Sequence, residues 1–304
     1  MPKNIKSQFN YVINSNFKEG MDKHSYKIEN GREMDTKIFS YTSRHNLLDI
    51  SKNFANFLKE NFTEVKFIKD IRPGMVQAFL DKKAENCTQN TITAYSNALF
   101  KLELMSEKTF NIKNLKWREN VEIPKTEREK SESRGVESVI SKEDLDKILD
   151  YIKEHKGQCG YAVMLQSFLG IRVQEIVSIK REDVKLEENK LIISNAKGGK
   201  TFSRDLAEEQ KEKFKEILDQ NYDKNKLFSI KSESINDYLR VIEDKLKLER
   251  HSFHDIRRYV AQNFYDNCRK EGDSKEEATK KTSIFLNHGP NREAMLRECY
   301  IKIR

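Results

Sequence analysis

The sequence contains few of the residues that interrupt helices. Among its 304 residues only 11 are glycine and 4 are proline. Because these two residue types are the strongest breakers of regular structure, their scarcity favours helices with only short strands. No apolar run approaches the length of about 18 residues that a membrane-spanning helix needs. We therefore expect a mainly helical protein that does not associate with a membrane.

The cysteines are few and scattered. They stand at Cys87, Cys159, Cys268 and Cys299, and none belongs to a CxxC pair. This spacing indicates neither a disulfide framework nor a zinc site. The amino-terminal residues also lack the apolar stretch of a secretory signal peptide. The simplest interpretation is a protein of the reducing cytoplasm.

Charge is abundant and unevenly balanced. Lysine and arginine total 57 against 49 aspartates and glutamates, which gives a formal net charge of +8. A basic excess of this size is compatible with a polyanionic partner such as nucleic acid.

The apolar pattern divides the chain into four parts. Residues 1–35 are polar and irregular and are expected to form an extension. Residues 36–117 carry apolar side chains at helical spacing, which predicts a small helical bundle. Residues 118–135 are charge-dense and contain Pro124, so they are expected to be a linker. Residues 136–304 form the second domain.

The second domain begins with a helix signal and contains one strand signal. Ser141 precedes an amphipathic run as its expected cap. The stretch LIISNAKGGKTFSRDL predicts two short strands joined by a Gly198-Gly199 turn. The rest of the domain has helical periodicity.

Four segments of this domain carry basic residues in sequence order. The segments are LGIRVQEIVSIKREDV with Arg172 and Glu175, SNAKGGKTFSRDL with Lys197 and Lys200, HDIRRYVA with His254 and Arg257, and FLNHG with His288. Each segment alone is a weak signal. Together and in this order they resemble the signature boxes of the tyrosine recombinases and phage integrases.

The resemblance implies a fold and a set of roles. The fold would be a helical, SAM-like core-binding domain and a catalytic domain that form a C-shaped clamp on DNA. Arg172 and Arg257 would grip a DNA phosphate, because the arginine fork forms paired hydrogen bonds to phosphate oxygens. Lys197 would be the general acid, with Lys200 as its rival. His254 and His288 would bind the phosphate or assist proton transfer.

In this family a tyrosine near the end of the domain attacks the phosphate. Tyr300 is the only tyrosine after His288, but it follows at a distance of twelve residues (300 − 288), longer than the usual spacing. Tyr259 is the competitor, although it lies two residues after Arg257 and positions i and i+2 of a helix point apart. Tyr265 also leaves the choice open. Glu175 is expected to tie Arg172 or its helix in place.

The resemblance implies an enzyme that breaks and rejoins DNA strands with neither a metal nor another cofactor. The leading hypothesis is a recombinase or integrase of a mobile element, acting on double-stranded DNA as a homotetramer, with accessory DNA-bending or transfer proteins as further partners. One alternative is a relaxase-like enzyme that nicks a transfer origin during conjugative plasmid transfer. A second alternative is a sequence-specific DNA-binding protein with a decayed active site.

Overall fold

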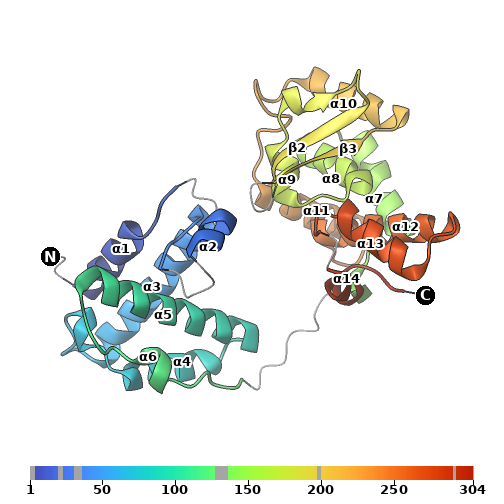
Figure 1. Ribbon diagram of the computed structural model, residues 1–304. Helices are drawn as coiled ribbons and strands as arrows, with labels where there is room; N and C mark the ends of the chain where they lie inside the picture. The colour runs from blue at the N-terminus through green and yellow to red at the C-terminus, as the bar shows by residue number, and fades with distance from the viewer. Residues whose placement is uncertain are drawn as a thin grey trace. The chain divides into compact units, whose positions relative to one another are not determined.

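The structure is a computed structural model that describes residues 4–19, 23–30, 36–126, 136–196, 200–289 and 292–303. The chain divides into two compact units, Met1–Glu132 and Ser133–Arg304 (Figure 1). Helices dominate both units, and the described residues contain one small sheet of three strands. The expected fold class, mainly helical with a small sheet, is confirmed.

The described part of the first unit is a helical bundle around an aromatic core. Its elements are α1 (Ile5–Ser15), α2 (Lys23–Asn30), α3 (Tyr41–Asn61), the 3-10 turn η1 (Ile68–Asp70), α4 (Pro73–Ala84), α5 (Gln89–Phe110) and α6 (Trp117–Asn120). The ring of Phe54 on α3 lies 5.0 Å from Phe79 and 6.2 Å from Trp117, measured between centroids. All three side chains are almost completely buried, so they anchor α3, α4 and α6 to one another.

The first 35 residues were expected to be an extension, but they contribute a helix to this core. Helix α1 packs against α3 and α5. Its residues Phe9, Val12 and Ile13 lie on one face and are fully buried. Asn4 caps the helix, since its side chain accepts a hydrogen bond from the backbone N–H of Ser7 at 2.8 Å. Three apolar residues in an otherwise polar segment were too weak a pattern to predict that this helix packs against α3 and α5.

The predicted linker of residues 118–135 also begins within the first unit. Val121 is buried in the core of that unit. The Thr126 hydroxyl donates to the Cys87 carbonyl at 2.8 Å. Residues 127–135 lie outside the described ranges.

The second unit is built around a buried central helix. Its elements are η2 (Val136–Ser138), α7 (Lys142–Glu154), α8 (Gln158–Leu169), α9 (Val173–Ser178), η3 (Arg181–Asp183), β1 (Val184–Lys185), β2 (Lys190–Ala196), β3 (Lys200–Asp205), α10 (Glu208–Gln220), α11 (Ser232–Leu246), α12 (Phe253–Lys270), α13 (Lys275–Phe285) and α14 (Glu293–Cys299). Helix α8 is apolar on nearly every side and contacts α7, α9, α11 and α12. Ser141 caps α7 as predicted, accepting the N–H of Asp144 at 3.0 Å.

The strands form an antiparallel sheet in the order β1-β2-β3. Strands β2 and β3 confirm the predicted pair, with Leu191 opposite Arg204 and Ile193 opposite Phe202. The register shifts between Ile193 and Ala196, so the end of β2 is irregular. The predicted Gly198-Gly199 turn lies outside the described residues.

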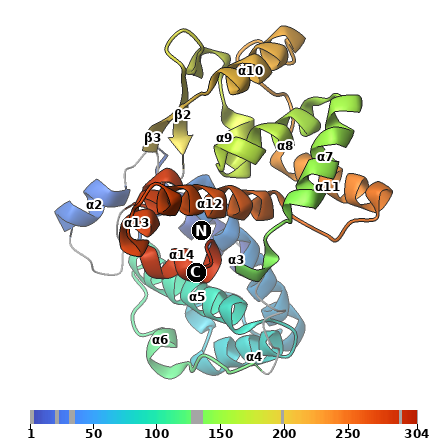
Figure 2. The ribbon, with the colours of Figure 1, turned by 90° about the vertical axis from the view of Figure 1, so that its right-hand side faces the viewer.

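Helix α12 connects two apolar cores of this unit. Phe253 and Ile256, in its first turns, belong to the large core around α8. Ala261 and Tyr265, further along, belong to a smaller core that α12 shares with α13 and α14. Figure 2 shows these three helices, coloured orange to red, lying together. The first turns of α12 therefore stand where the two cores meet.

Candidate active site

Arg172 stands at the junction of α8 and α9. Helix α8 ends at Leu169 and is followed by Gly170, whose φ of 59° lies in the left-handed region that favours glycine. Glu175, only 3% exposed, accepts the backbone N–H of Arg172 at 2.7 Å and its Nη1–H at 2.8 Å. Among the described residues, the bond from Nη1 to Glu175 is the one that holds the Arg172 side chain, which keeps 22% of its surface exposed. Its remaining N–H groups are available to an anion.

Arg257 lies behind this junction and is almost completely buried, with 1% of its surface exposed. Its Nη1 donates to the carbonyl of Gly170 and its Nη2 to that of Leu286, both at 2.8 Å. Glu175 lies 3.9 Å away and supplies a compensating charge. Burial lowers the pKa of the Arg257 guanidinium, whereas Tyr300 and Glu175 raise it. The guanidinium thus joins the loop after α8 to the loop after α13.

His288 follows α13, and its orientation comes from Arg257. The distance from Arg257 Nη2 to His288 Nε2 is 3.2 Å. Arginine can only donate, so Nε2 accepts and the neutral ring carries its proton on Nδ1. The preceding residue, Asn287, has a φ of 54°, a left-handed angle that asparagine tolerates.

Tyr300 is placed between the two histidines. Its ring centroid lies 5.2 Å from that of His254 and 5.2 Å from that of His288, in each case at an interplanar angle of 62°. The Arg257 guanidinium lies 5.7 Å from the centre of the same ring. Tyr300 itself is 4% exposed. The structure therefore brings this tyrosine together with three of the predicted basic residues.

Burial and the neighbouring cations keep the His254 ring neutral. Desolvation, followed by the positive charges of Arg258 and Arg257, lowers the pKa of His254 from 6.5 to about 4, against the opposing charge of Asp255. Much of the residue nevertheless remains exposed. A neutral, accessible imidazole beside a tyrosine can accept a proton.

A hollow of about 670 Å³ opens next to Arg172 and His254. Its walls come from α9, from α11 and from the first turn of α12, with Gln174 of α9 and Asn236 of α11 among the lining side chains. An anion entering there would meet the free donors of Arg172 and the exposed side of His254.

Tyr259 and Tyr265 lie in other surroundings. Tyr259 is half-buried against the large core around α8. Tyr265 is 2% exposed within the smaller core, and its hydroxyl has no hydrogen-bond partner among the described residues. In the described residues neither ring is in contact with His254 or His288 in the way that Tyr300 is.

The predicted lysine lies outside the described residues. Lys197 precedes β3, and Lys200 is the first residue of that strand. The site geometry therefore comes from the arginines, the histidines and Tyr300.

Arg204 on β3 is a cation of this site that the sequence analysis missed. It donates to the carbonyl of Phe285 and lies 4.2 Å from the centre of the Phe285 ring. Burial, followed by the charge of Arg257, lowers the pKa of Arg204 to about 10. Strand alternation places Phe202 and Arg204 on one face of β3, and this spacing was the signal that could have revealed an inward-facing arginine.

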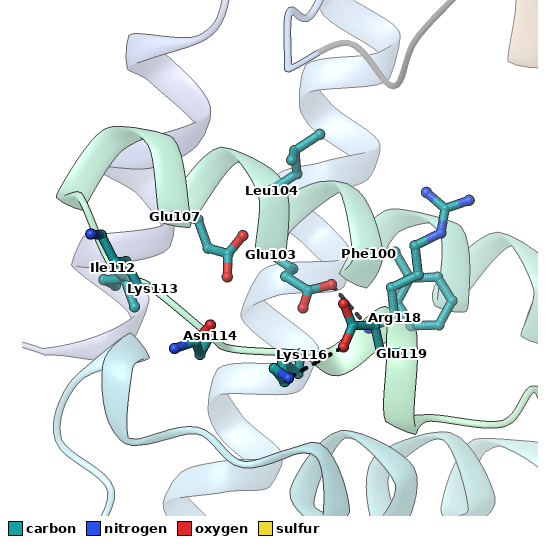
Figure 3. A pocket seen from close by; sticks show the side chains of 10 residues that line it. All are labelled: Phe100, Glu103, Leu104, Glu107, Ile112, Lys113, Asn114, Lys116, Arg118 and Glu119. Carbon is teal, nitrogen blue, oxygen red and sulfur yellow. Dashed lines mark hydrogen bonds and ion pairs between the residues drawn. The ribbon is translucent and has the colours of Figure 1, made fainter.

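A second cavity, in the first unit, is lined by two glutamates that are already hydrogen-bonded to the backbone (Figure 3). Glu103 accepts the backbone N–H groups of Trp117 and Arg118, the latter at 3.0 Å. Glu107 accepts the N–H of Leu115 at 3.0 Å. Burial raises the pKa of Glu103, and its two backbone bonds oppose that rise. These carboxylates hold the chain between α5 and α6, which is a structural task.

The described residues lack both a metal-binding cluster and a membrane-spanning helix. They contain no group of three or more His, Cys, Asp or Glu side chains that could hold a metal ion. Nor do they contain a helix with the length and apolar character needed to cross a membrane.

Residues 138–269 match the model of the phage integrase family. This part of the chain is a phage integrase domain. It contains Arg172, Lys197, His254 and Arg257, whereas His288 and Tyr300 follow it. The TnP I resolvase of Bacillus thuringiensis is 25% identical over 173 residues, which cover 50% of this chain and 61% of the resolvase. The chain thus spans about three fifths of that relative.

Solved structures show the same fold as the whole chain. The XerH site-specific recombinase bound to its difH substrate is 17% identical, with a TM-score of 0.62 and coverage of 99% of this chain and 91% of XerH. A lambda integrase dimer bound to a core site is 15% identical, with a TM-score of 0.62 and coverage of 91% and 95%. At such identities the likeness concerns the fold, which is that of the tyrosine recombinases.

Proposed function

We propose that this protein cleaves and rejoins DNA strands through a covalent 3′-phosphotyrosyl intermediate, with Tyr300 as the nucleophile. The observation that carries the proposal is the position of the Tyr300 ring between His254 and His288 and beside the Arg257 guanidinium. The phage integrase domain and the recombinase fold support it.

In the proposed reaction, Tyr300 Oη attacks phosphorus and the bond from phosphorus to the 5′ oxygen breaks. The negative charge that builds on the non-bridging oxygens is stabilised by fixed cations. Arg172 has N–H donors available for these oxygens, and Arg257 contributes its positive charge from its buried position next to them. The phosphotyrosyl bond conserves the energy of the phosphodiester, so rejoining needs neither ATP nor a metal ion.

Two proton transfers accompany the exchange of bonds. His254 is the proposed acceptor of the tyrosine proton, because its ring is neutral whereas the Nε2 lone pair of His288 is engaged by Arg257. His288 is then a positioning group. Lys197 is the proposed general acid that protonates the departing 5′ oxygen.

We further propose that the enzyme acts on double-stranded DNA as a recombinase of a mobile element, assembled as a homotetramer. Support comes from the fold, which it shares with a lambda integrase solved as a tetramer bound to a Holliday junction, at 14% identity and a TM-score of 0.61. A recombinase should generate Holliday junctions, whereas a relaxase-like enzyme should leave one nicked strand with protein attached.

The test is covalent capture on nicked DNA. A pool of short duplexes with a randomised centre and one nick lets the cleaved 5′ fragment diffuse away, which traps the protein on the 3′ end. The wild-type protein should give a denaturant-resistant adduct on a denaturing gel.

Two single substitutions then identify the nucleophile. Tyr300→Phe should abolish the adduct while DNA binding persists, and Tyr259→Phe should retain it. The absence of an adduct with the wild-type protein would favour the DNA-binding alternative. An adduct that survives in Tyr300→Phe but disappears in Tyr259→Phe would move the nucleophile to α12.

A further inference from the structure

The segment that carries Tyr300 is bound to α12 on both sides of the tyrosine. Before it, Arg258 Nε donates to the carbonyl of Cys299 at 2.8 Å. After it, the Gln262 side chain accepts the backbone N–H of Lys302 at 2.7 Å and donates to the Lys302 carbonyl at 3.3 Å. Arg258 and Gln262 are four residues apart, so they project from one face of α12.

Arg258 is itself held in a fixed orientation. It is 9% exposed and forms an ion pair with the fully buried carboxylate of Asp255. That carboxylate also accepts the N–H of Ser252 at 2.6 Å and the hydroxyl of Ser138 at 2.9 Å. The guanidinium therefore meets the Cys299 carbonyl from a preorganised position.

Within the segment itself, the backbone N–H groups of Tyr300 and Ile301 both donate to the Leu296 carbonyl, at 2.8 and 3.0 Å. Beyond it, the Lys302 ammonium forms an ion pair with Glu137 at 2.6 Å. Helix α14 has only seven residues and ends at Cys299, immediately before Tyr300. So short a helix contributes little stability of its own, and the carbonyls of its last turn need partners. Bonds from α12 to Cys299 and Lys302 supply partners on either side of the tyrosine.

We propose that Arg258 and Gln262 act as a clasp, two positioning residues that hold Tyr300 over the cations of its own chain in the orientation for attack. This inference rests on the proposed function of Tyr300. The bonds of the clasp go to backbone atoms of the segment. The clasp acts through the placement of the nucleophile, and a misplacement of about 1 Å can cost on the order of 100-fold in rate.

The test compares substitutions on one face of α12 with a matched control. Gln262→Leu removes the amide, and Gln262→Asn keeps the amide but withdraws it by one methylene. Asn263→Leu makes a similar change at the adjacent exposed position, for which the described residues show no hydrogen bond to the segment. All three are measured in the full chain.

Three sets of measurements separate positioning from a general structural role. The first is the single-turnover rate of adduct formation at saturating nicked duplex. The second is the affinity for the same duplex, together with the thermal unfolding midpoint. The third is the rate at which the half-buried thiol of Cys299 reacts with a disulfide reagent, in a Cys87→Ser/Cys159→Ser background where the other remaining cysteine, Cys268, is buried.

Both Gln262 substitutions should lower the cleavage rate about 10- to 100-fold, as expected for loss of alignment. They should leave DNA affinity and the unfolding midpoint at the values of Asn263→Leu. The Cys299 thiol should react several times faster in both variants, because the segment is released from α12.

Unchanged cleavage and unchanged Cys299 reactivity would overturn the clasp. So would a loss of rate matched by an equal loss of affinity or stability. If the wild-type protein forms no adduct, the proposed function fails, and Cys299 reactivity alone then decides whether the segment is clasped.

Discussion

At the scale of single residues, Arg172 and Arg257 differ in exposure and in hydrogen-bond partners. Arg172 is partly exposed and tied to Glu175 through one nitrogen of its fork. Arg257 is buried, with both terminal nitrogens bonded to backbone carbonyls. A buried charge held in this way organises the loops around it. Arg172 is therefore the better placed of the two to meet a phosphate directly, and Arg257 the better placed to fix the geometry.

The pKa of His254 predicts a pH dependence of stability. Because its pKa is about 4 in the folded protein and 6.5 ordinarily, the unfolded chain binds the proton more tightly. The stabilising effect of the neutral ring is complete above pH 6.5 and is lost as the pH falls towards 4. Urea unfolding of wild type and His254→Gln across this range measures the effect. The wild-type free energy of unfolding should fall more steeply with decreasing pH than that of the variant, and parallel curves would contradict the shift.

At the scale of elements, the turn from α8 to α9 has no room for a side chain. Gly170 has a left-handed φ, and a Cβ there would meet Val260 Cγ1 at 2.9 Å and Phe285 Cε1 at 3.2 Å. Its carbonyl is also the acceptor of Arg257. A distortion of this turn would therefore reach Arg172 and Arg257 together.

Gly170→Ala should lower the free energy of unfolding by about 1–3 kcal/mol and reduce adduct formation. Chemical denaturation measures the first effect and the nicked-duplex assay the second. Gly74→Ala is the control, because Gly74 is exposed near the start of α4 with open space around its Cα. That change should be neutral or stabilising by up to about 1 kcal/mol. Equal effects of the two substitutions would show that the crowding at Gly170 is unimportant.

At the scale of the whole molecule, the net charge of +8 predicts electrostatic binding to DNA. Each neutralised phosphate adds about −0.9 to the slope of log affinity against log salt. If six to ten phosphates are contacted, affinity should fall by about 10³–10⁵ between roughly 50 and 200 mM salt. Titration of a labelled duplex at several salt concentrations measures the slope. A nearly flat response would argue against extensive contact with the DNA backbone.

The sequence by itself determined the helical character of the chain, the pair of strands and the basic residues of the second unit. These features depend on neighbouring residues, such as the few helix breakers or the short boxes around Arg172 and Arg257, and local patterns survive in a single sequence. The same patterns did not predict that α1 belongs to the core of the first unit, because its few apolar residues become significant only when α3 and α5 cover them.

The tertiary structure alone decided which groups meet. From the sequence, Tyr300 and Tyr259 were both open candidates, and the fold puts only Tyr300 between the rings of His254 and His288. Arg204 and the clasp on α12 were likewise invisible, since their partners lie far away along the chain. Local spacing determines which face of an element a side chain occupies. Only the packing of α12, α13 and α14 determines what that face touches, because such contacts depend on the positions of residues distant in sequence.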